Sequence, residues 1–243
     1  CGEKMKKLLL SWQQIPSPIV TEIISFECDG TVLDTEHGCF NNEALYTCIQ
    51  VLKLQKKKCF VRLKDISKSM IGMCLDAGVD GLIFSTIETK EQCDKIIEYS
   101  MFPPDGKRGL GLMRQNYWGA RAANFCNSLV WNRNEISPIL IPQIESKEGV
   151  DNLEDIMNDH FQYYLVGPYD LSLSLGIPGE FDKKLYKSYI KKIDDLIPKN
   201  KMAIHTPKKQ EFKSEHLKYA IRCIGMDTTT LITSYKELIN VKL

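Results

Sequence analysis

The sequence predicts an α/β fold and, within that class, a (β/α)8 TIM barrel. Eight short apolar segments of strand-like composition alternate, in most cases, with longer stretches of helical periodicity, as in parallel α/β proteins. A chain of 243 residues suits one such barrel, which commonly has about 250 residues. No glycine-rich turn follows the first segment, which disfavours a doubly wound nucleotide-binding sheet. We therefore expect residues 1–243 to form a single barrel domain.

The eight predicted strands are short apolar runs, mostly bounded by polar residues, glycine or proline. In chain order they are Leu8–Trp12, Thr31–Leu33, Cys59–Leu63, Gly81–Phe84, Ile139–Ile144, Tyr163–Val166, Met202–Ile204 and Ile221–Ile224.

Helices are predicted where apolar residues recur with a period near 3.6. One begins at Ser17-Pro18, because proline is favoured in the first turn, and another ends at Gly78, a common helix stop. The apolar faces of these two helices and of the last predicted helix consist of Ile19, Val20, Ile23 and Ile24; Met70, Met73, Cys74 and Ala77; and Leu231, Ile232, Tyr235, Leu238 and Ile239.

The connection from Thr86 to Pro138 is long and includes a proline- and glycine-rich stretch. Loops of this length in compact domains are usually functional or interfacial.

Composition indicates a soluble cytoplasmic protein with no nucleic-acid or membrane partner. Thirty-two basic and 31 acidic residues leave a net charge of +1, and no apolar run reaches the roughly 18 residues needed to cross a bilayer. Nine cysteines, with no Cys-x-x-Cys pair, favour a reducing compartment over a disulfide framework. Residues 1–4 are interpreted as a cloning remnant before Met5, or else as the mature end of a lipoprotein.

Polar residues follow several of the predicted strands, where a barrel has its active site. Because the carboxyl ends of all eight strands meet at one mouth, we expect these side chains to converge there. They are Asp34 and His37 after the second strand, Arg62 near the end of the third, Gln143 and Glu145 at the fifth and Asp170 after the sixth.

Glu145 and Asp170 are candidate metal ligands. Two carboxylates without a Cys or His pattern suit an octahedral Mg²⁺ or Mn²⁺ with positions open to substrate, rather than a tetrahedral zinc. The alternative is that each carboxylate caps the helix that follows it.

His37 and Arg62 are candidate catalytic residues. A loop histidine suits a general base near neutral pH, since the reference pKa of histidine is about 6.5, but a surface histidine is the simpler alternative. The Arg62 guanidinium suits a carboxylate or enolate, or else a structural salt bridge to a strand-end carboxylate.

At these residues the chain resembles the class II pyruvate aldolases of the HpcH/HpaI type, which cleave 2-keto-3-deoxy sugar acids and related 4-hydroxy-2-oxo acids. The resemblance extends over nearly the whole chain, and the ordered set of motifs carries it. The motifs include Asp34-Thr35-Glu36-His37-Gly38, Val61-Arg62, Leu75-Asp76-Ala77-Gly78, Pro103-Pro104-Asp105-Gly106, Gln143-Ile144-Glu145, Gly167-Pro168-Tyr169-Asp170 and Gly225-Met226-Asp227-Thr228-Thr229.

The resemblance implies a role for each matching residue. It implies Glu145 and Asp170 as metal ligands, His37 as the base with Asp76 as its partner, and Arg62 as the group that binds the keto oxygen and the enolate. It also implies Gln143 as a lining residue and the backbone around Gly167 and Pro168 as the group that binds the pyruvate carboxylate. The implied cofactor is Mg²⁺ or Mn²⁺, with Co²⁺ as a further candidate.

The resemblance also implies a phosphoenolpyruvate/pyruvate-type barrel whose last helix is swapped between subunits of a trimer or hexamer. The implied reaction is retro-aldol cleavage to pyruvate and an aldehyde, or its reverse, by a carbon–carbon lyase. The alternatives are a lyase for acyl-CoA thioesters and a non-catalytic barrel with an assembly role. Ser85 stands where the family commonly has proline, and His205 is either an aldehyde-side contact or a loop histidine packed on Pro207.

Overall fold

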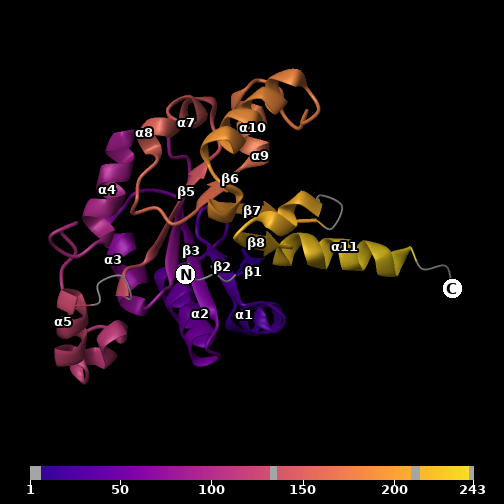
Figure 1. Ribbon diagram of the computed structural model, residues 1–243. Helices are drawn as coiled ribbons and strands as arrows, with labels where there is room; N and C mark the ends of the chain where they lie inside the picture. Colours follow the sequence, from indigo (N-terminus) through magenta and orange to yellow (C-terminus); the bar gives the residue numbers. More distant parts are fainter. Residues whose placement is uncertain (1–6, 132–135, 209–213, 241–243) are drawn as a thin grey trace.

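The computed structural model describes residues 7–131, 136–208 and 214–240, so residues 1–4 and their interpretation lie outside it. Eight parallel strands pair in chain order and β1 pairs with β8, which closes the sheet (Figure 1). The prediction of a (β/α)8 barrel is therefore confirmed. The strands are β1 (Leu8–Gln13), β2 (Gly30–Asp34), β3 (Lys58–Leu63), β4 (Gly81–Phe84), β5 (Ile139–Ile144), β6 (Tyr164–Val166), β7 (Met202–Thr206) and β8 (Ile221–Ile224).

Helices surround the barrel, and the described part of the long connection between β4 and β5 includes α4, a 3-10 turn and α5. Ser67 caps the start of α3 by accepting a bond from the Met70 N–H, and Gly78 ends it with a φ of 89°, as predicted. The α-helices are α1 (Pro18–Ser25), α2 (Asn42–Leu54), α3 (Lys68–Ala77), α4 (Lys90–Ser100), α5 (Ala122–Trp131), α7 (Lys147–Asp151), α8 (Leu153–Ile156), α9 (Pro168–Ser174), α10 (Lys184–Leu196) and α11 (Asp227–Ile239).

Alternation along the strands creates two apolar layers. One set of strand residues, including Val32, Phe60 and Ile141, fills the barrel interior. The intervening residues, such as Leu33 and Val61, pack outward against the helices. Polar residues at the strand ends are thereby held on a rigid rim.

The predicted apolar face of α1 is only partly turned toward the barrel, since Val20 and Ile24 are half-buried. Ile19 is 67% exposed and Ile23 is 65% exposed, whereas Thr21 and Ser25 are fully buried. The Thr21 hydroxyl donates to the side-chain carbonyl of buried Gln13, so a polar contact with β1 sets the rotation of this helix. The predicted position of α1 is therefore correct, while its most buried residues, Thr21 and Ser25, are polar.

The last helix, α11, projects away from the barrel (Figure 1). Its start is tied to the barrel because the Asp227 carboxylate accepts bonds from the backbone N–H groups of Gln14 and Ile15. Beyond that anchor, the five apolar residues predicted for its buried face are all at least 48% exposed.

Within the described ranges, no helix has both the length and the apolar character needed to cross a bilayer. The eight cysteines in those ranges are all free thiols.

Candidate active site

Arg62 lies buried between two carboxylates at the barrel mouth. Its Nε and Nη2 donate to the two oxygens of Asp34 at 2.9 Å and 2.6 Å, and its Nη1 lies 2.9 Å from Glu36 Oε2. Burial alone would raise the pKa of Asp34, but the hydrogen bonds and charge of Arg62 outweigh it and hold that pKa below its ordinary value. Asp34 therefore stays ionised and fixes the guanidinium in one orientation.

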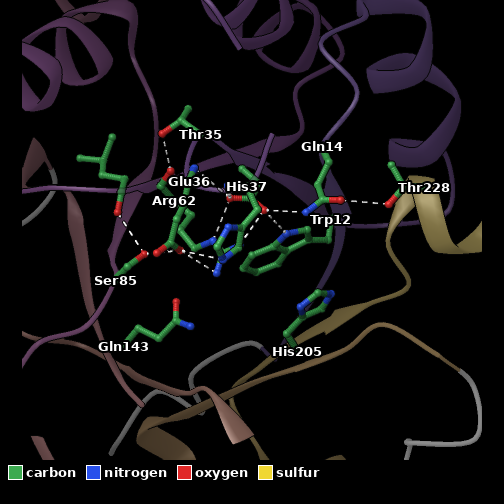
Figure 2. A network of polar contacts seen from close by, with 12 residues as sticks. Trp12, Gln14, Thr35, Glu36, His37, Arg62, Ser85, Gln143, His205 and Thr228 are labelled. Atoms are coloured by element: carbon green, nitrogen blue, oxygen red, sulfur yellow. Dashed lines mark hydrogen bonds and ion pairs between the residues drawn. The ribbon is translucent and has the colours of Figure 1, made fainter. Parts of the chain in front are cut away.

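The loop after β2 carries His37 to the edge of this cluster (Figure 2). Its backbone N–H, like that of Glu36, donates to Asp34 Oδ1, which shapes the loop. The His37 side chain is 60% exposed, and its Nε2 lies 3.8 Å from Glu36 Oε2. The Ser85 hydroxyl donates to the same Glu36 oxygen at 2.7 Å. His37 is thus held near the Arg62 cluster with its ring open to the mouth.

Glu145 is a buried carboxylate with strong local support. Its Oε1 accepts bonds from the Thr86 backbone N–H at 2.8 Å and from the Thr86 hydroxyl at 2.9 Å, and its Oε2 accepts from the Gln143 amide. Thr86 has a φ of 51°, an uncommon conformation for a β-branched residue, which aims both donors at one oxygen. Burial, with a further contribution from the charge of Asp170, raises the pKa of Glu145 to about 7.

Gly167 makes room for this carboxylate. A Cβ at that position would lie 2.4 Å from Glu145 Oε2 and 3.1 Å from Gln143 Nε2, so no other residue fits there without displacing them. The Gly167 N–H, however, donates to the Ile144 carbonyl, and Pro168 has no N–H. Neither of these two residues therefore offers a free N–H of its own, and the binding of the pyruvate carboxylate by the backbone around them stays a prediction. Space is what Gly167 provides.

Asp76 does not join the site. It lies in the last turn of α3, before β4 begins, and therefore on the side of the amino ends of the strands. There it accepts a hydrogen bond from Arg108 at 3.0 Å. His37 follows the carboxyl end of β2, at the opposite end of the barrel. The predicted pairing of Asp76 with His37 is therefore wrong within one chain.

The site can be tested for its fit to a divalent cation. Glu145 and Asp170 lie close enough for the charge of Asp170 to raise the pKa of Glu145, although neither contacts a protein cation among the described residues. The Gln143 Oε1 is buried and has no hydrogen-bond partner in the same part of the chain. Two carboxylates and an amide oxygen are hard donors of the kind Mg²⁺ and Mn²⁺ prefer, so these residues fit such an ion.

Sequence reasoning missed several residues of this site. Asp34 was noted without a role, and it now proves to be the anchor of Arg62. The signal for that contact was present: Asp34 and Arg62 end adjacent strands and are register partners across the sheet. Thr86 and Ser85 carried no comparable signal, because they act through the local backbone path after β4.

Comparisons with known proteins show what this chain is similar to. A family model described as HpcH/HpaI aldolase/citrate lyase matches residues 12–233. A 2-keto-3-deoxy-L-rhamnonate aldolase from Escherichia coli is 32% identical over 153 residues, which are 62% of this chain and 55% of the relative. A 5-keto-4-deoxy-D-glucarate aldolase from Shigella boydii is 32% identical over 68% of this chain and 63% of its own length. The matched segments therefore span little more than half of these curated relatives.

Solved structures share the fold over almost the whole chain. A family protein from Burkholderia cenocepacia superimposes with a TM-score of 0.84 at 22% identity, covering 96% of this chain and 93% of that one. A structure titled citrate synthase SbnG gives a TM-score of 0.81, also at 22% identity, and covers 92% of that chain. At this identity the likeness establishes the fold alone.

Proposed function

Because the chain belongs to the HpcH/HpaI aldolase/citrate lyase family, we propose that it is a carbon–carbon lyase, a divalent-metal-dependent aldolase. It would cleave a 4-hydroxy-2-oxo acid of the 2-keto-3-deoxy type to pyruvate and an aldehyde, or run the reverse reaction. One observation carries the proposal: a buried arginine held in fixed orientation shares the barrel mouth with two neighbouring carboxylates, buried Glu145 and exposed Asp170.

Glu145 and Asp170, with the Gln143 amide oxygen, would hold the cation. A bound Mg²⁺ or Mn²⁺, or Co²⁺ as a further candidate, supplies Lewis-acid polarisation of the 2-keto group. The remaining chemistry belongs to the protein side chains.

His37 is proposed as the general base of the cleavage direction. It would accept the proton of the C4 hydroxyl; the C3–C4 bond then breaks, the C4–O group becomes the aldehyde, and the bonding pair forms the pyruvate enolate. Arg62 donates toward the enolate oxygen, where negative charge develops. Return of a proton to C3 gives pyruvate. Because Asp34 and Glu36 fix the guanidinium in advance, little reorganisation is needed when the charge appears.

The two alternatives, a lyase for acyl-CoA thioesters and a non-catalytic barrel, receive less support. The curated relatives at 32% identity are named aldolases, whereas the structure titled as a citrate synthase is similar at 22%. A purely structural barrel would have no need to keep Glu145 buried at a mouth where burial raises its pKa to about 7.

The direct test is proton exchange at the methyl group of pyruvate. In deuterated buffer with Mg²⁺ or Mn²⁺, the protein should exchange these protons without any aldehyde, and should form an aldol product when aldehydes are added. Protein that does neither with any divalent ion would refute the proposal.

Metal binding should depend on pH through Glu145. Its pKa is raised from 4.5 to about 7, so its protonated form stabilises the metal-free fold below pH 4.5, and that contribution is lost as pH rises through about 7. A cation needs the ionised form, so the gain in melting temperature on adding Mn²⁺ should be larger at about pH 8 than at about pH 6. Equal gains at both pH values in a thermal-shift assay would contradict this assignment, and Glu145→Gln should abolish the pH difference.

We further propose a homo-oligomer, a trimer or hexamer in which α11 packs on a neighbouring copy. Exposed apolar residues on α11 and on α1 support it, since contiguous exposed apolar surface marks interaction sites. A reducing, cytoplasmic location is proposed on the free cysteines, most of which are buried.

Leu238→Glu should therefore dissociate the oligomer. Leu238 is 68% exposed on α11, and a charge there would be buried at the interface. Light scattering coupled to gel filtration should show a smaller mass for this variant but not for Lys236→Glu, an exposed change on the same helix. A monomeric wild-type protein would exclude the assembly.

A further inference from the structure

One arc of the barrel mouth is not used by the proposed pyruvate chemistry. His37 follows β2, Arg62 lies near the end of β3, Glu145 follows β5 and Asp170 follows β6, so the residues assigned to the cleavage chemistry occupy the arc from β2 to β6. The remaining arc, from β7 through β8 to β1, carries two ring side chains, His205 on β7 and Trp12 on β1. When the pyruvate half of a bound substrate lies at β3 to β6, the arc from β7 to β1 is left for the aldehyde-derived half.

The two rings form a fixed platform. The His205 and Trp12 rings stack with centroids 4.1 Å apart and planes inclined by 10°. The Trp12 indole N–H donates to Asp34 Oδ2 at 3.2 Å, and the Arg62 guanidinium carbon lies 4.9 Å from the Trp12 ring centroid. In Figure 2 the Trp12 ring lies between Arg62 and His205. The platform is therefore tied to the same buried cluster that orients Arg62.

The hydrogen bond of His205 determines its tautomer. Its Nε2 lies 3.0 Å from the carbonyl oxygen of Gly225, and a carbonyl oxygen only accepts, so Nε2 carries the proton. Nδ1 is then an unprotonated acceptor. In the part of the chain that the structure describes, the His205 ring makes no other recorded hydrogen bond.

Burial keeps this ring neutral. It lowers the pKa of His205 to about 4, so the imidazole stays uncharged at neutral pH. A ring of such low basicity, with Nε2 committed to Gly225, is poorly suited to act as a base. It is well suited to accept one hydrogen bond from a neutral donor.

On the basis of the proposed function, we infer that His205 is a specificity-determining residue whose Nδ1 accepts a hydrogen bond from a hydroxyl group on the aldehyde-derived half of the substrate. The hydroxyl belongs to the carbon next to the aldehyde carbon, and the apolar edge of that fragment packs on the His205 ring, which the fully buried Trp12 ring supports from behind. Proposed substrates of the 2-keto-3-deoxy sugar-acid type release such 2-hydroxyaldehydes, and His205 is then the residue that selects them over plain aliphatic aldehydes of the same size.

The experiment compares two aldehydes that differ in one group. Glycolaldehyde and propionaldehyde place a hydroxyl and a methyl group, respectively, at the same position. The ratio of their kcat/KM values for addition to pyruvate, with Mg²⁺ or Mn²⁺, is the readout. Wild-type protein should favour glycolaldehyde. His205→Phe keeps a planar ring on Trp12 but has no acceptor, so the ratio should fall by roughly 3- to 10-fold.

Two further variants test the interpretation. His205→Asn offers a carbonyl oxygen near the position of Nδ1 and should keep more of the preference than His205→Phe, which separates the hydrogen bond from stacking. His160→Phe is the matched control, because His160 precedes β6 at the far end of the barrel and should leave the ratio unchanged. Circular dichroism confirms that each variant is folded.

The outcomes distinguish this inference from the proposed function. If wild-type protein exchanges the pyruvate methyl protons and forms aldols, but the ratio is the same in His205→Phe, the role of His205 is refuted while the aldolase stands. If wild-type protein performs neither reaction with any divalent ion, both are refuted.

Discussion

Glu145→Gln should reduce divalent-dependent aldol cleavage and pyruvate proton exchange by on the order of a thousandfold. The amide keeps an oxygen to accept the two bonds from Thr86, and its NH2 can donate to the unpartnered Gln143 oxygen once the Gln143 amide turns over. Local structure is thereby preserved, but the negative charge that a cation requires is removed. Burial already disfavours that charge, which is why the pKa of Glu145 is about 7. Metal-free Glu145→Gln protein should therefore be at least as stable as wild type at about pH 8.

Loss of activity without loss of metal-free stability separates a functional role of Glu145 from a structural one. Activity is followed by pyruvate release, metal binding by calorimetric titration with Mn²⁺, and stability by thermal unfolding without metal. Glu148→Gln is the matched control, because Glu148 is exposed on α7 three residues along the chain. If Glu145→Gln retained metal affinity and turnover, or if it lost stability without metal, Glu145 would be a structural residue and the metal site would lie elsewhere.

Arg62→Lys should lower kcat by about 100- to 1000-fold while changing KM much less. Lysine keeps the positive charge, but a single ammonium cannot reproduce the planar fork that binds both oxygens of Asp34 and also reaches Glu36. The enolate oxygen would then lose a donor held in fixed position. The unfolding free energy should also fall, by about 1–3 kcal/mol, because buried Asp34 loses a hydrogen bond.

The split between kcat and KM is the decisive measurement for Arg62. A stability defect alone would reduce the amount of active protein without altering pyruvate exchange per folded molecule. Arg121→Lys serves as the control, since Arg121 is exposed and stacks on Tyr117, outside the mouth. An Arg62→Lys protein with near wild-type exchange per folded molecule would show that the Asp34–Arg62 pair is only a structural salt bridge.

Much of the fold could be predicted because each signal was local. Apolar runs marked all eight strands, and their boundaries differ from the structure by at most two residues. Gly78 marked the end of α3 through its need for a positive φ. The orientation of the helices was less predictable: of the four apolar residues of α1, Ile19 and Ile23 are exposed, because the contact between Thr21 and Gln13 turns the adjacent side of the helix inward.

The candidate site likewise has one part that the sequence predicts and one part that it does not. The placement of Arg62, Glu145 and His205 at strand ends follows from the chain, since parallel strands bring all their carboxyl ends to one rim. The partner that each side chain finds there does not follow. Asp34 rather than a ligand neutralises Arg62, Thr86 supports Glu145 through an unusual backbone angle, and Asp76 pairs with Arg108 at the other end of the barrel.

The sequence by itself determined the barrel, the rim on which the polar residues gather and the resemblance to an aldolase family, because strand periodicity and order are local properties. Only the tertiary structure decided which charges meet. Closing the barrel brings β7 and β1 to either side of β8, which lets His205 stack on Trp12, and buries Glu145 deeply enough to raise its pKa. These effects depend on distance and desolvation between residues far apart in the chain, and no pattern along the chain encodes them directly.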